Sequence, residues 1–166
     1  MKQNGFTLVE LLVAVFIFSV LVVLAGGSFI GAMAAQRRAL NIKKAEENGK
    51  FILELMAREI RVANPINTGN SACLGTTILN FLHPVNGTVE YFLSGNQIHR
   101  RVNGVDTVVS NPDVDVSRLN FCISGNQSGD DRQPLVTVIL GLNAVGAPQN
   151  DVFDLQTTVS QRVLSD

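Results

Sequence analysis

One carboxylate near the start of the chain stands out for its setting. Residues 6–35 are apolar or small almost throughout, and their only charge is Glu10. An unpaired charge buried in a membrane costs at least about 2–3 kcal/mol, so Glu10 needs a cationic partner. In a helix Phe6 lies one turn before Glu10 on the same face, so an amine would be such a partner if the chain were cut just before Phe6. The amine of a neighbouring chain is another, and both alternatives stay open.

Other residue types that carry chemistry lack the spacing that chemistry needs. His83 and His99 have no second ligand at metal spacing, so we expect no metal site. The serines lie in no nucleophile elbow, and there is no phosphate-binding loop. We therefore expect neither a cofactor nor enzyme activity. A calcium site would require Asp113, Asp115, Asp130 and Asp131 to converge, and solvated turns are the favoured interpretation.

Charge gives no reason to expect a nucleic-acid partner. The chain of 166 residues has a formal net charge of -1. Arg100, Arg101 and Arg118 are candidates for a basic strip on a sheet, but no exposed aromatic residues are interleaved with them. A solvated strand face is the better interpretation, and no nucleic acid is expected.

The apolar run is long enough to cross a bilayer. As a helix, residues 6–35 extend about 45 Å, more than the roughly 30 Å of a hydrocarbon core. A secretory signal with cleavage near Ala35 is one alternative, but its apolar region is normally shorter. A simple membrane anchor is another, although it leaves Glu10 unexplained. The surplus apolar surface favours packing against other protein chains.

The string GFTLVELL at residues 5–12, behind the short polar segment MKQN, resembles the class III signal of type IV pilins and type II secretion pseudopilins. The resemblance implies that a prepilin peptidase cleaves between Gly5 and Phe6 and methylates the new amine of Phe6. It also implies that Glu10 helps set the register of assembly. The implied partners are other pilin or pseudopilin subunits, the inner-membrane assembly machinery and membrane lipid.

The resemblance divides the chain into a leader at 1–5, a transmembrane and filament-core helix at 6–35, and an extracytoplasmic head at 36–166. The protein would cross the cytoplasmic membrane once before assembly, and then enter a pilus or a periplasmic pseudopilus. The cations Arg37, Arg38, Lys43 and Lys44 follow the span and, by the positive-inside rule, favour the opposite orientation. We give the family resemblance the greater weight.

The head is predicted to be α+β, with a long N-terminal helix packed on a small antiparallel sheet. Apolar residues recur at three- and four-residue steps up to Ala63, which predicts one helix over 6–63 with an amphipathic part at 36–63. Short β runs separated by Asn-Gly and Ser-Gly-Asn turns predict hairpins. The expected strands, within a sheet spanning 74–160, are 76–82, 88–93, 97–102, 105–109, 116–124, 135–142 and 152–159.

Within this head, the order of a hairpin ending in arginine and a strand VSRLNF at 116–121 is similar to W-type minor pilins and J-type minor pseudopilins. The expected function is therefore that of a minor filament subunit. The alternatives are a major pilin, or a membrane-tethered or secreted binding domain without a filament role.

The two cysteines, Cys73 and Cys122, are expected to form a disulfide in the head. An even number of cysteines in a domain placed outside the cytoplasm makes pairing reasonable. Two buried thiols that never meet are the alternative.

Overall fold

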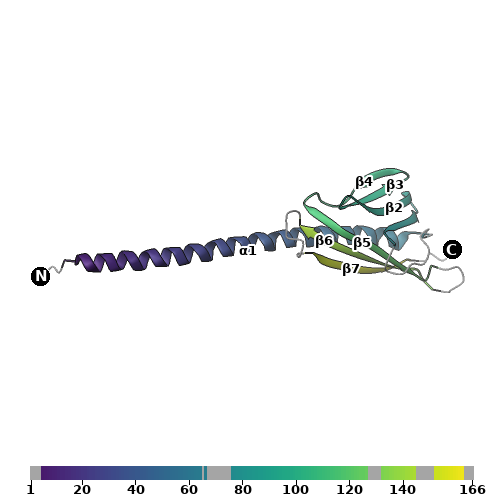
Figure 1. The fold of residues 1–166 in the computed structure, drawn as a ribbon. Helices are drawn as coiled ribbons and strands as arrows, with labels where there is room; N and C mark the ends of the chain where they lie inside the picture. Colours follow the sequence, from purple (N-terminus) through teal and green to yellow (C-terminus); the bar gives the residue numbers. More distant parts are fainter. Residues whose placement is uncertain (1–4, 65, 67–75, 127–131, 145–151, 163–166) are drawn as a thin grey trace. The chain divides into compact units, whose positions relative to one another are not determined.

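The computed structural model describes residues 5–64, 66, 76–126, 132–144 and 152–162. The chain divides into two compact units, residues 1–40 and 41–166. A single helix, α1 (Leu8–Val62), contributes residues to both units (Figure 1).

In the first unit, α1 exposes nearly all of its large apolar side chains. The helix is long and apolar enough to cross a membrane. Its two serines are compatible with lipid, because Ser19 Oγ donates to the Val15 carbonyl at 2.7 Å and Ser28 Oγ donates to the Leu24 carbonyl at 3.1 Å. Each hydroxyl is thus satisfied within the helix.

Among its described residues, the second unit contains residues 41–62 of α1 and seven strands. The strands are β1 (Ile78–His83), β2 (Gly87–Ser94), β3 (Gln97–Val102), β4 (Val105–Val108), β5 (Val114–Ser124), β6 (Leu135–Ala144) and β7 (Phe153–Ser160). They pair antiparallel in two sheets, ordered β1-β2-β3-β4 and β5-β6-β7. The predicted strands are confirmed with small shifts at their ends, but two sheets replace the single sheet that we expected.

Strand β5 connects the two sheets. The Val116 N–H donates to the Asn96 carbonyl at 2.9 Å, and the Phe121 N–H donates to the Thr76 carbonyl at 2.8 Å. These bonds join β5 to the turn between β2 and β3 and to the segment just before β1, and no ladder forms between the sheets. Local strand patterns do not specify which strands become neighbours, so this division was invisible in the sequence.

Two of the predicted hairpin turns have the geometry that their residues favour. Gly95 and Asn96 both have positive φ, 54° and 63°, as do Asn103 and Gly104, 49° and 88°. Paired left-handed residues match the twist of antiparallel strands, which is why Asn and Gly dominate such turns.

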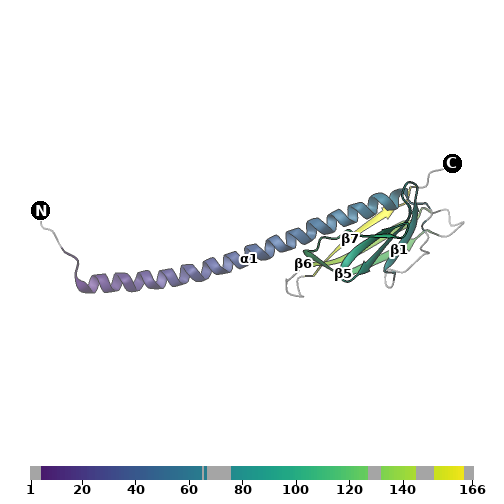
Figure 2. The same ribbon diagram turned by 90° about the horizontal axis from the view of Figure 1, so that it is seen from above.

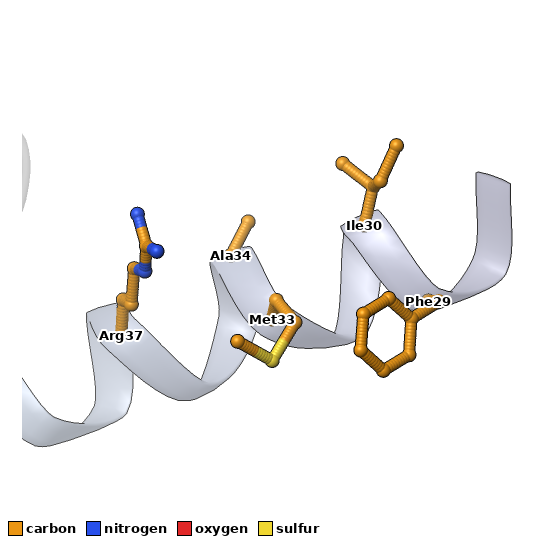
Figure 3. A pocket seen from close by; sticks show the side chains of 5 residues that line it. All are labelled: Phe29, Ile30, Met33, Ala34 and Arg37. Carbon is orange, nitrogen blue, oxygen red and sulfur yellow. The ribbon is translucent and has the colours of Figure 1, made fainter. Parts of the chain in front are cut away.

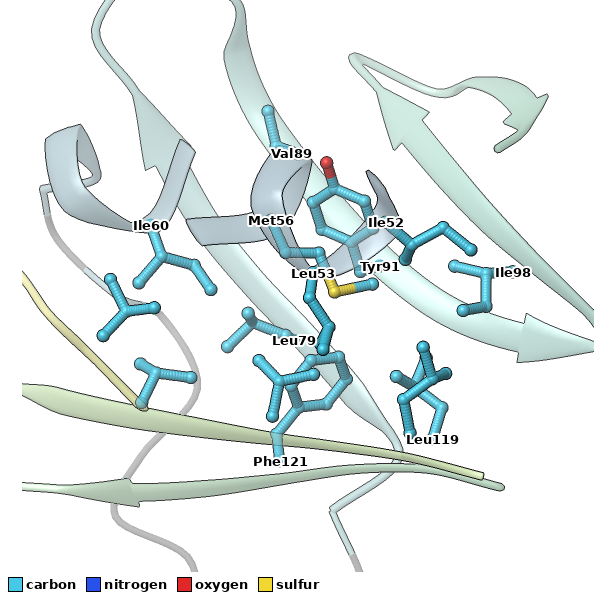
Figure 4. Close-up of a cluster of buried hydrophobic side chains, with 14 of the residues drawn as sticks. Ile52, Leu53, Met56, Ile60, Leu79, Val89, Tyr91, Ile98, Leu119 and Phe121 are labelled. Atoms are coloured by element: carbon cyan, nitrogen blue, oxygen red, sulfur yellow. The ribbon is translucent and has the colours of Figure 1, made fainter. Parts of the chain in front are cut away.

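The core lies between one face of α1 and the inner faces of both sheets (Figure 4). Ile52, Met56 and Ile60 of the helix are fully buried, as are Tyr91 of β2 and Phe121 of β5. Figure 2 shows β7 running beside the head part of α1. The helix and the sheet come close at Gly49, where a Cβ atom would collide with the ends of Leu142 of β6 and Leu155 of β7.

The end of α1 is held by both sheets. The Asn64 N–H donates to the Leu82 carbonyl of β1 at 2.9 Å. On the other side, the Arg162 N–H donates to the Arg61 carbonyl at 2.8 Å, and Gln161 Nε2 donates to the Ala63 carbonyl. The segment after β7 therefore satisfies carbonyls that a helix end otherwise leaves without partners.

Candidate processing and assembly site

The predicted processing segment lies outside the helix. Gly5, Phe6 and Thr7 are not helical, and Phe6 is 83% exposed. We expected the helix to begin at Phe6, but it begins at Leu8. Phe6 therefore precedes the first helical turn, and the pairing of its amine with Glu10 stays a prediction.

A capping box between Thr7 and Glu10 starts the helix. The Glu10 N–H donates to Thr7 Oγ1 at 3.3 Å, and the Thr7 N–H donates in return to Glu10 Oε2 at 3.5 Å. This reciprocal pair satisfies two of the N–H groups that a helix start leaves without partners. The pattern Thr-x-x-Glu at residues 7–10 is the signal in the sequence that predicts such a cap.

The arrangement leaves two groups available for chemistry. The peptide bond between Gly5 and Phe6 lies in an exposed, non-helical segment, the form of backbone that a peptidase can bind. Within the described part of the first unit, the cap uses only Oε2 of Glu10. The other carboxylate oxygen remains able to accept a hydrogen bond from an amine.

The helix that follows is apolar up to its first cations. Figure 3 shows the side chains of Phe29, Ile30, Met33 and Ala34, with Arg37 following on the same helix. The gap that they line is formed by one helix alone, so it is a space between neighbouring side chains and not a ligand pocket.

In the head, a polar network that sequence analysis missed connects α1 to the first sheet. Glu59 is 8% exposed. Its Oε2 accepts from Tyr91 Oη at 2.6 Å and from Arg100 Nε at 3.1 Å, and its Oε1 accepts from Arg100 Nη2 at 2.5 Å. Asn86 Nδ2 also donates to Oε1, at 3.4 Å. The bidentate arginine and the tyrosine hydroxyl fix the position of the helix against β2 and β3.

The network shifts the acidity of all three groups. Burial acts to raise the pKa of Glu59, but hydrogen bonds from Arg100 and Tyr91 outweigh it, so the pKa is lowered. Burial and then the hydrogen bond to Glu59 raise the pKa of Tyr91. The hydrogen bond to Glu59 raises the pKa of Arg100. Both ions thus keep their charges inside the head.

The three arginines considered as a basic strip are each paired with a carboxylate. Arg100 binds Glu59, as described above. Arg101 lies 2.7 Å from Glu90, and Arg118 lies 2.6 Å from Asp154. The positive charge is thereby compensated on the head's own surface.

The remaining predicted sites have separate outcomes. No group of three metal-ligating side chains occurs among the described residues, and Asp130 and Asp131 lie outside them. Cys122 lies on β5 opposite Thr137 of β6, whereas Cys73 lies outside the described residues. The disulfide stays a prediction.

Together, the long apolar helix, the exposed segment before it and the small α+β head define a pilin-like architecture. The model of the prokaryotic N-terminal methylation motif matches residues 1–26. The chain therefore carries the signature of type IV pilins and pseudopilins. No curated protein and no solved structure matches it.

Proposed function

We propose that this chain is a minor subunit of a type IV pilus or of a type II secretion pseudopilus. The observation that carries the proposal is the methylation motif at residues 1–26 on a helix able to cross a membrane. The order of strands and arginines in β2–β5 supports the minor role. The head would lie outside the cytoplasm.

In this function the described residues have distinct tasks. Water adds across the bond between Gly5 and Phe6, which leaves a carboxylate on Gly5 and an amine on Phe6. The cap keeps the helix from extending into this bond. Glu10 then offers its second oxygen to the amine of Phe6, in the same subunit or in the next one. The charge inside the membrane is thereby neutralised.

Processing is tested by intact-mass analysis of the chain extracted from membranes. The expected mass lacks residues 1–5 and includes one methyl group on Phe6. An amino terminus near Ala35 would establish the secretory alternative instead.

Assembly is tested with Glu10→Ala, which should remain in the membrane but enter filaments poorly. Removal of the Glu10 carboxylate relieves the cost of burying a charge, so insertion of the helix into the membrane is unaffected. The amine of Phe6, however, loses its charged partner. Glu54→Ala, an exposed glutamate on the same helix, is the matched control. Normal incorporation of Glu10→Ala would contradict the pairing.

A further inference from the structure

The first cation after the apolar run, Arg37, has no counter-charge near it in the sequence. Residues 11–45 contain no carboxylate, and the next acidic residue is Glu46. In a helix, a side chain reaches the residues three and four positions away, and for Arg37 all four of these are uncharged. Arg38 adds a second positive charge at the same level of α1. This part of the helix surface therefore attracts an anion.

The position of Arg37 along α1 matches the head-group level of a bilayer. From Leu8 to Arg37 the helix rises about 44 Å, at about 1.5 Å per residue. A bilayer with its head groups is about 40–45 Å thick. When Leu8 lies at one surface of the membrane, Arg37 thus reaches the phosphates of the other surface, at the end of the span from which the head follows. The anions that it meets there are those of lipids.

The helix surface next to Arg37 has the character that an acyl chain requires. Phe29 and Ile30 are 66% and 71% exposed, and with Met33 and Ala34 they form an apolar strip that leads to Arg37 (Figure 3). An acyl chain needs no enclosed pocket, because lipid surrounds a membrane helix. The guanidinium at the end of the strip binds phosphate oxygens with two parallel hydrogen bonds. One phospholipid can therefore use both parts of this surface.

We propose that Arg37, with Arg38 beside it, binds the phosphate of an anionic phospholipid, whose acyl chain packs along Phe29, Ile30 and Met33. The inference rests on the proposed function only in requiring that α1 crosses a membrane. Each cation near an anionic membrane surface strengthens binding about fivefold. The bound lipid fixes the depth of the helix before assembly. It also gives a task to arginines that the positive-inside rule assigns to the cytoplasmic side.

The test uses the full chain in nanodiscs that contain equal amounts of phosphatidylglycerol and phosphatidylcholine. Native mass spectrometry of the released chain compares its one-to-one complexes with each lipid. The parent should retain phosphatidylglycerol at least about fivefold more than phosphatidylcholine, and Arg37→Gln should lower this ratio about fivefold. Arg37→Lys keeps the charge and should retain most of the preference. Arg58→Gln is the matched control, because it removes an exposed guanidinium of α1 that is paired with Glu54, and it should leave the ratio unchanged.

The outcomes separate the two proposals. A parent chain without lipid preference, or an Arg37→Gln ratio equal to that of the parent, would overturn the lipid site and leave the filament function intact. An equal loss in Arg58→Gln would also overturn the site, since overall charge would then explain the preference. Chain dimers in place of the lipid complexes would assign the surface to a second copy and overturn the lipid site. A chain that does not enter nanodiscs would overturn both the site and the membrane helix on which the proposed function depends.

Discussion

Among the residues described in the head, Glu59 is the charged residue whose side chain is buried. It is buried, and its partners come from two strands that lie far from it in sequence. A buried charge is tolerated because Arg100 and Tyr91 replace the hydrogen bonds of water. Loss of one partner leaves the others without compensation, which makes the network sensitive to single substitutions.

We expect Glu59→Gln to lower the free energy of unfolding by about 3 kcal/mol, since it leaves Arg100 partly buried without its counter-ion. The matched control is Glu54→Gln, five residues earlier on the same helix, whose partner Arg58 and own side chain are both exposed. This change should cost less than about 1 kcal/mol. Denaturation of the detergent-solubilised chain is readily followed by fluorescence, because Tyr91 is the only tyrosine and there is no tryptophan. Equal losses in the two variants would refute the assigned role.

The same network predicts how stability depends on pH. The pKa of Glu59 in the folded head lies below its usual value of 4.5. Its contribution is therefore complete above about pH 4.5 and is lost as the pH falls through the lower pKa of the folded state. Over that acidic range the parent should lose stability more steeply than Glu59→Gln. Parallel curves of unfolding free energy against pH would contradict this assignment.

Among the elements, the contact of α1 with β6 and β7 depends on the absence of a side chain at position 49. We expect Gly49→Val to destabilise the head by about 1–3 kcal/mol, because the added atoms overlap Leu142 and Leu155. Lys50→Val places the same residue on the exposed side of the helix and should change stability far less. The measurement is again the midpoint of tyrosine-monitored unfolding. A neutral Gly49→Val would mean that the helix and sheet separate without cost.

The elements also show what the sequence could and could not predict. Strands β2, β3 and β4 were anticipated almost to the residue, because Ser-Gly-Asn and Asn-Gly turns define their ends locally. The helix begins two residues after Phe6, because the capping box of Thr7 and Glu10 fixes its start. The pairing of Glu59 with Arg100 spans 41 residues, and no local pattern predicts a contact at that separation. The division into two sheets was not predicted for the same reason, because it depends on contacts between distant parts of the sequence.

For the whole molecule, a head that lies outside the cytoplasm predicts a disulfide between the two cysteines. If the head folds outside the cytoplasm, Cys73 and Cys122 should be joined, and the closed loop should contribute about 4 kcal/mol to stability. Thiol titration of the denatured, unreduced chain should find no free thiol. Two free thiols per chain would refute the bond and weaken the extracytoplasmic placement.

The bonds at the end of α1 also set the order in which the head can be completed. Gln161 and Ala63 are separated by 98 positions in the sequence, and the backbone N–H of Arg162 donates to the carbonyl of Arg61. A ribosome makes the chain from its amino end, so the helix exists well before the residues that cap its last carbonyls. Until β7 and the segment after it emerge, those carbonyls and the sheet edge at β6 lack their partners. Closure of the head is thus a late event in synthesis, and it depends on residues made long after the apolar part of α1.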